Sequence, residues 1–169
     1  MNITFFGGAM NDTTTTQYQE TILIGKYLAD KNYNIKSGGY RGLMEAISYG
    51  ASLSENKVKI IGYTCKSFGY TKGNKYLTET IICDNIFDRL NYLITDSSAY
   101  IFQIGSIGML SELFLTLDIY RKIDNKPKII LIGDFWKPII ESLKIIVSEK
   151  ELNLLTIVSN YNEFIEIKF

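Results

Sequence analysis

The stretch Ala99–Arg121, AYIFQIGSIGMLSELFLTLDIYR, decides the fold. Its first part, Ala99–Phe102, is an apolar run of strand length and too short for a helix. A turn follows at Gly105–Gly108, and Met109–Tyr120 then has the pattern of a helix, with Ser106 placed to cap it. The first N–H groups of a helix have no intrahelical partner, and the helix dipole is positive there. A strand, glycine turn and helix in this order therefore predict that the negative end of a ligand binds at the turn.

Strands and helices alternate along the whole chain. The expected strands are Asn2–Phe6, Asn34–Ser37, Val58–Thr64, Thr78–Cys83, Ala99–Phe102, Lys128–Ile132 and Leu155–Val158. The expected helices are Gln17–Lys31 (with a capping box of Thr16 and Gln19), Leu43–Leu53, Asn85–Thr95, Met109–Tyr120 and Trp136–Ser148. Near-continuous apolar strands between helices are typical of a parallel sheet covered on both faces. The sequence predicts an α/β protein with a Rossmann-like, doubly wound parallel sheet in three layers (α/β/α), and residues 1–169 as a single domain.

Composition excludes several classes of function. Lys and Arg number 18, as do Asp and Glu, so the net charge is zero and gives no electrostatic case for nucleic acid or membrane binding. The apolar runs are of strand length, which argues against a membrane span, and we expect a cytoplasmic protein with a small-molecule partner. Histidine is absent, which excludes Ser-His-Asp triads and His-ligated metals. Cys65 and Cys83 lack metal-ligand spacing, so we expect no metal and no cofactor.

Three glycine turns follow strands, at Gly7–Ala9, Gly38–Gly42 and Gly105–Gly108. In open α/β sheets, ligands bind at the carboxyl ends of the strands. Three such turns at that edge favour a nucleotide-like ligand, although a turn of this kind is also what any tight connection requires. None of them has the spacing GxGxxG or GxxxxGK[ST], and no GxSxG occurs, so dehydrogenase, P-loop and serine-hydrolase functions are not indicated.

Individual turn residues have expected roles. Gly8, Gly38 and Gly39 are expected to let the backbone approach the ligand. Arg41 can neutralise a phosphate, or it can simply face solvent. The lysine-bearing segment Cys65–Leu77 can be a lid over the ligand or a solvated surface loop.

Two motifs resemble those of one family. Ser37–Met44, SGGYRGLM, resembles the GGGxxGLM segment of the LOG ("Lonely Guy") family, whose members are often described as lysine decarboxylases. Ile104–Glu112, IGSIGMLSE, stands where that family has PGGxGTxxE. The order of the motifs also agrees, and the resemblance covers about residues 2–148.

The resemblance implies hydrolysis of the N-glycosidic bond of a nucleoside 5′-monophosphate, which releases the base and ribose 5-phosphate. It places the family's catalytic arginine and glutamate on Arg89 and Glu112. It also implies a homodimer or higher homo-oligomer, in agreement with a helix Met109–Tyr120 that is apolar almost all round. Read without the resemblance, Glu112 is an ordinary helix carboxylate, and Arg89 is a surface arginine that can pair with Asp88 or Asp84.

The phosphate turn departs from the family pattern. Ile104, Ser106 and Met109 replace the motif's proline, second glycine and threonine, and Leu90 replaces the lysine that usually follows the arginine. The phosphate would therefore be held mainly by backbone N–H groups, and the residues that we expect around it are Gly105, Ser106, Ile107, Gly108 and Met109. These departures leave a second function open, a non-catalytic sensor or carrier of a nucleotide-like ligand.

Overall fold

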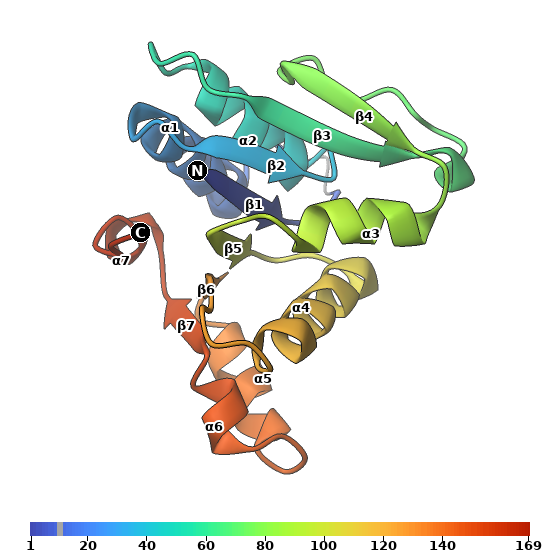
Figure 1. Ribbon diagram of the computed structural model, residues 1–169. Helices are drawn as coiled ribbons and strands as arrows, with labels where there is room; N and C mark the ends of the chain where they lie inside the picture. Colours follow the sequence, from blue (N-terminus) through green and yellow to red (C-terminus); the bar gives the residue numbers. More distant parts are fainter. Residues whose placement is uncertain (10–11) are drawn as a thin grey trace.

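The computed structural model describes residues 1–9 and 12–169, which form one parallel sheet with helices on both faces (Figure 1). The strands are β1 (Asn2–Phe6), β2 (Asn34–Ser37), β3 (Ile60–Cys65), β4 (Glu79–Cys83), β5 (Ala99–Phe102), β6 (Lys128–Ile132) and β7 (Leu155–Val158). The helices are α1 (Thr16–Asp30), α2 (Leu43–Ser52), α3 (Ile86–Ile94), α4 (Ile107–Tyr120), α5 (Trp136–Leu143), α6 (Glu149–Leu152) and α7 (Tyr161–Phe164), with a 3₁₀ turn, η1 (Lys66–Phe68). The expected Rossmann-like α/β architecture is thus confirmed.

The strand order is β4-β3-β2-β1-β5-β6-β7, and neighbouring strands run parallel. The chain builds the sheet outward from β1 to β4, then returns to the other side of β1 and builds outward to β7. The first four strands therefore extend the sheet to one side of β1, and β5, β6 and β7 extend it to the other side. The position between β1 and β5 is the topological switch point, where doubly wound sheets bind their ligands.

Two hydrophobic clusters fill the two sides of the sheet. The first contains side chains of α1, α2 and α7, and the second contains side chains of α3, α4, α5 and α6. Every residue of β5 is buried, because the strand lies in the middle of the sheet and is covered on both faces. This explains why its sequence is continuously apolar rather than alternating.

Helices α1 and α2 approach closely through two glycines. A Cβ on Gly25 would lie 2.3 Å from the backbone oxygen of Ile47, and a Cβ on Gly50 would lie 2.0 Å from that of Ile22. Backbone atoms cannot move aside as a flexible side chain can. The two helices therefore form one tightly joined layer.

Several expected details are wrong. The side chain that caps α1 belongs to Thr15, which accepts from the N–H of Tyr18, so the expected capping box of Thr16 and Gln19 is replaced; Gln19 donates to the carbonyl of Thr13. Helix α4 begins at Ile107 rather than at Met109. Ser106 occupies its N-cap position, but within the described chain its hydroxyl makes no capping hydrogen bond.

The C-terminal region also differs from expectation. Helix α5 ends at Leu143 rather than at Ser148, and the short helices α6 and α7 were not expected. The apolar residues Ile145 and Ile146 continue the helical pattern, yet they are 86% and 82% exposed. Strand β3 begins at Ile60, two residues later than expected. Within the described residues, none of the helices combines the length and apolar character needed to span a bilayer.

Candidate functional site

A pocket of about 460 Å³ lies at the switch point. Its walls come from the segment after β1, from η1, α2 and α3, and from the first turns of α4. The lining residues are Gly7, Gly8, Ala9, Met44, Phe68, Ile86, Phe87, Arg89, Leu90, Ser106, Gly108, Met109, Ser111 and Glu112. Segments that are far apart in sequence thus meet where the sheet topology predicts a ligand.

Arg89 and Glu112 form an ion pair in this pocket. Nη1 of Arg89 lies 3.4 Å from Oε1 of Glu112, and the two side chains are only 8% and 12% exposed. Burial raises the pKa of Glu112 to about 7, although the neighbouring positive charge of Arg89 acts in the opposite direction. A carboxyl group with a pKa near 7 is present in both protonation states at neutral pH, which suits it to acid–base chemistry.

The guanidinium group of Arg89 is fixed from several sides. Its Nε donates to the carbonyl of Tyr63 at 2.8 Å, at the carboxyl half of β3. Its Cζ lies 5.7 Å from the ring centroid of Tyr40 and 5.5 Å from that of Phe68, which is cation–π range. A Cβ on Gly38 would lie 2.1 Å from Nη2, so only glycine leaves room for this guanidinium. Gly38 thus shapes the site through Arg89.

The turn before α4 is held against the end of β1. The N–H of Gly8 donates to the carbonyl of Ile104 at 2.9 Å, and a Cβ on Gly105 would lie 3.2 Å from the same nitrogen. The carbonyl of Gly8 accepts from the N–H of Leu43, the first residue of α2. These bonds join the starts of two helices to one short segment. The first turn of α4 consequently faces the pocket in a fixed orientation.

Gly108 lines the pocket at this turn and leaves open space there. Apart from its chain neighbours and the backbone of its own helix, a Cβ built on Gly108 would meet no described atom within 4 Å. Ser106, Gly108 and Met109 line the pocket, whereas Ile107 is 77% exposed and is not among the lining residues. The exposed backbone of this turn can therefore be approached by an anion.

Some expected residues lie elsewhere. Gly39 has a φ of +74° and packs against Gly62 of β3, so its role in the structure is the close approach of two backbone segments. Arg41 is exposed and lines a neighbouring hollow. In the segment Cys65–Leu77, Phe68 reaches the pocket, while Lys66 is directed to Asp84, 2.5 Å away.

The apolar wall was missed from the sequence. Phe68 and Phe87 are 52% and 77% exposed, and with Met44 and Ile86 they line the pocket. The signals in the sequence that could have indicated this wall were an aromatic residue in a polar loop, Phe68, and one on the polar side of a helix, Phe87. Leu90, noted only as a departure from the family pattern, is part of this wall.

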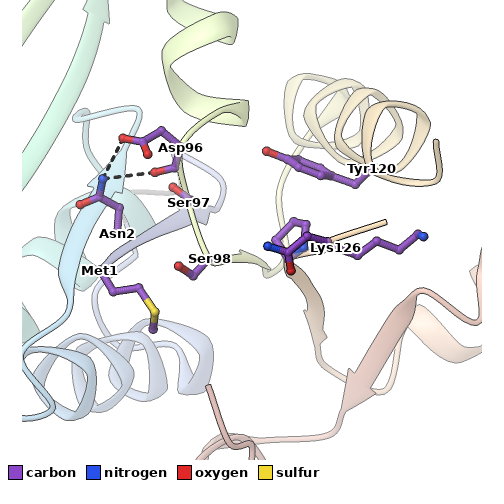
Figure 2. Close-up of a pocket in the computed structure, with 9 residues that line it drawn as sticks. Met1, Asn2, Asp96, Ser97, Ser98, Tyr120 and Lys126 are labelled. Atoms are coloured by element: carbon purple, nitrogen blue, oxygen red, sulfur yellow. Dashed lines mark hydrogen bonds between the residues drawn. The ribbon is translucent and has the colours of Figure 1, made fainter. Parts of the chain in front are cut away.

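A second hollow of about 470 Å³ lies at the opposite, amino end of the strands. Figure 2 shows its lining residues, including Asn2, Asp96, Ser98 and Lys126. Here Nδ2 of Asn2 donates to the carbonyl and the carboxylate of Asp96, at 3.1 and 3.2 Å. These bonds tie β1 to the segment before β5. The hollow lies at the opposite edge of the sheet from the switch-point pocket and contains no part of the Arg89–Glu112 pair.

Comparison with known proteins agrees with this architecture. The solved molybdenum cofactor binding protein of Rippkaea orientalis is 23% identical, with a TM-score of 0.77 over 98% of this chain and 93% of that one. The solved molybdenum cofactor carrier protein of Chlamydomonas reinhardtii is 18% identical, with a TM-score of 0.71 over 98% and 94%. At these identities the likeness establishes a shared fold. No curated protein matches the sequence.

The family is established by a separate comparison. The model of the family described as possible lysine decarboxylase matches residues 44–167, well over half of the chain. The matched region includes α3, α4 and all of α2 except its first residue, and therefore both Arg89 and Glu112. This chain belongs to the possible lysine decarboxylase family, the LOG family.

Proposed function

We propose that the protein binds a nucleoside 5′-monophosphate in the switch-point pocket and hydrolyses its N-glycosidic bond. The observation that carries the proposal is the meeting of Arg89 and Glu112, 3.4 Å apart and mostly buried, beside the exposed N-terminal turn of α4. A buried carboxyl group with a raised pKa in a cleft is typical of a functional site. Family membership supports the same choice of residues.

The phosphate would bind at the first turn of α4. Its N–H groups at Ile107, Gly108 and Met109 have no carbonyl partner one turn earlier, and the helix dipole favours an anion there. The open space at Gly108 allows a phosphate oxygen to come close. The altered motif residues supply fewer side-chain contacts, so the backbone would contribute most of the phosphate binding.

Glu112 would act at the ribose. As the bond between C1′ and the base nitrogen breaks, its electron pair leaves with the base and positive charge develops on the ribose ring. The ionised carboxylate would stabilise this charge and accept a proton from the water whose oxygen adds to C1′, and this proton would then pass to the nitrogen of the departing base, which leaves as the neutral free base. Arg89 would favour the ionised form of Glu112, since its charge lowers the pKa that burial raises.

The test is release of free base from AMP, GMP, CMP, UMP and N6-substituted AMP, followed by chromatography. Glu112→Gln should reduce the rate at least 100-fold while AMP binding persists. Asp118→Asn is the matched control, because Asp118 lies on the same helix but is half-exposed and pairs with Arg121 and Lys122. Full activity in Glu112→Gln would contradict the proposed role.

A second function, non-catalytic binding of a nucleotide-like ligand or the molybdenum cofactor, is favoured by a specific observation. Ser106, Met109 and Leu90 differ from the family's phosphate-binding and basic residues, all at positions that line the pocket. Two proteins of the same fold are described as a binding protein and a carrier protein for the molybdenum cofactor. Ligand binding without base release from any nucleotide would support this function over hydrolysis.

We also propose that the protein forms a homodimer or higher homo-oligomer through α3 and α4. These helices lie side by side (Figure 1), and they carry exposed apolar side chains. The residues are Phe87 and Ile107, each 77% exposed, with Phe114 and Leu115 at 41% and 37%. Exposed apolar clusters of this kind are typical of protein–protein contacts.

A further inference from the structure

An aromatic shelf adjoins the switch-point pocket. We define it as Tyr40, Phe68 and Tyr70, which line a hollow of about 470 Å³ together with Ala9 and Arg41. Phe68 and Tyr70 are 52% and 47% exposed, although both carry large apolar rings. The ring centroid of Tyr40 lies 6.2 Å from that of Phe68 and 6.1 Å from that of Tyr70. Three aromatic rings thus face one hollow on the surface.

The shelf is continuous with the Arg89–Glu112 pair. Ala9 and Phe68 line both the hollow and the pocket. The guanidinium of Arg89 lies within 6 Å of the ring centroids of Tyr40 and Phe68, so two rings of the shelf are adjacent to the ion pair. A ligand that extends from the turn before α4 past Glu112 can therefore also contact the aromatic rings.

The rings are held in position by the protein itself. The hydroxyl of Tyr40 accepts from the N–H of Cys65 at 2.8 Å, and Tyr70 forms a backbone bridge to the same residue. Nδ2 of Asn74 donates to the carbonyls of Gly39 and Tyr40, which fixes the backbone that carries Tyr40. A surface arranged in advance lowers the entropic cost of binding.

We propose that this shelf is the subsite for the flat heteroaromatic ring of the ligand, and that it recognises the face of the ring rather than its edge. The proposal rests on the proposed function for the place of the phosphate. A hollow of this volume matches a small molecule. Its surface is formed mainly by ring carbons, and stacking on aromatic side chains accepts every base because each has a π-face. Arg41 and the Tyr70 hydroxyl are the polar groups that the ring's edge can meet. The shelf therefore selects a planar nitrogen heterocycle and discriminates weakly between purines.

The experiment is calorimetric titration of the full chain with adenosine, AMP and ribose 5-phosphate, with AMP titrated into the Glu112→Gln background so that it is bound without being hydrolysed. Phe68→Ala and Tyr70→Ala should each weaken binding of adenosine and AMP about 5- to 150-fold, the range that corresponds to about 1–3 kcal/mol for stacking of one base. Binding of ribose 5-phosphate should be unchanged. Phe68→Leu, which keeps apolar bulk but has no ring, should weaken binding, whereas Phe68→Trp should retain it. Leu23→Ala is the control, because Leu23 is a similarly exposed apolar residue, on α1, that lines neither hollow.

The outcomes separate the shelf from the phosphate site. Loss of adenosine binding in Phe68→Ala supports the shelf even if ribose 5-phosphate does not bind, a result that would count against the proposed function alone. Unchanged adenosine binding in both alanine variants, or absence of adenosine and AMP binding in the unaltered protein, overturns the shelf. Equal weakening of AMP and ribose 5-phosphate also overturns it, since the ring would then have no separate contact.

Discussion

Nη1 of Arg89 lies 3.4 Å from Oε1 of Glu112, across the space between α3 and α4. Neither side chain has much access to water, so the ionisation of Glu112 depends on burial, which raises its pKa, and on the charge of Arg89, which lowers it. This dependence leads to a measurable pH effect and to a requirement for glycine at position 38.

Stability should fall as the pH rises from about 4.5 to 7 because of Glu112. Its pKa is about 7 in the folded protein against 4.5 ordinarily, so the folded state holds more protons in this window. The shift corresponds to at most about 3 kcal/mol. Urea unfolding followed by fluorescence of Trp136, the single and buried tryptophan, measures it. Glu112→Gln should lack this fall; an identical pH profile in the variant would contradict the assignment.

Gly38→Ala should disable the site while the protein remains folded. The added methyl group would stand 2.1 Å from Nη2 of Arg89, so the guanidinium must leave its place beside Glu112. We expect at least a tenfold loss of base release or ligand affinity. Gly133→Ala serves as control, because Gly133 has a φ of +118° and the nearest atoms to a Cβ there belong to Phe135 rather than to Arg89. Equal losses in both variants would indicate a general effect of lowered stability.

Lys36 should make the protein more stable as the pH rises from 8 to 10. This lysine is 3% exposed and donates to the carbonyl of Thr95 at 2.7 Å. Burial lowers its pKa to about 8, while the charge of Asp96 opposes the shift. The unfolded chain therefore binds more protons between pH 8 and 10.5, and stability rises with pH by about 2 kcal/mol.

Lys36→Met should be free of this rise, as measured by the same urea titrations. Above pH 10 the stability of the unaltered protein should instead fall as the pH rises. Burial raises the pKa of Tyr63 to about 12, so the folded state holds the Tyr63 proton at pH values where the unfolded chain has lost it. A rise of equal size in Lys36→Met would assign the effect to other groups.

Assembly should depend on the exposed apolar faces of α3 and α4. Sedimentation velocity of the unaltered protein should give a dimer or larger species. Phe114→Glu together with Leu115→Lys should give monomers with an unchanged thermal midpoint of each folded chain, since both side chains are exposed. Ile145→Glu is the control, an exposed apolar residue after α5. A monomer at all concentrations would refute the proposed assembly.

The strands were predictable because burial imposes continuous apolar runs. Strands β1, β2, β5, β6 and β7 have the bounds that the sequence predicts. The helix ends were harder to predict, because two neighbouring threonines are both suitable N-cap residues for α1. Thr15 is the N-cap because its backbone is extended, with ψ of 147°, whereas Thr16 is already the first residue of the helix. At Ile145 and Ile146 the apolar pattern predicts a helix, yet these side chains do not face the core.

The candidate site was predictable in part. The resemblance alone singled out Arg89 and Glu112, which the structure places in contact although they are far apart in sequence. The apolar and aromatic walls could not be predicted, because Phe68 reaches the pocket only through the path of the loop after β3. Short-range patterns carry no information about which loop residue meets a distant helix.

The strand order divides the pocket between two segments of the chain. Gly7–Ala9, Phe68 and α3 precede residue 97, while the turn before α4 and Glu112 follow it. Cutting the chain between α3 and β5 would separate Arg89 from Glu112 and leave an incomplete wall on each fragment. A ligand of this pocket would therefore link the two fragments, and its binding energy would be available only when both associate, which makes the protein suited to a split reporter whose reassembly requires the ligand.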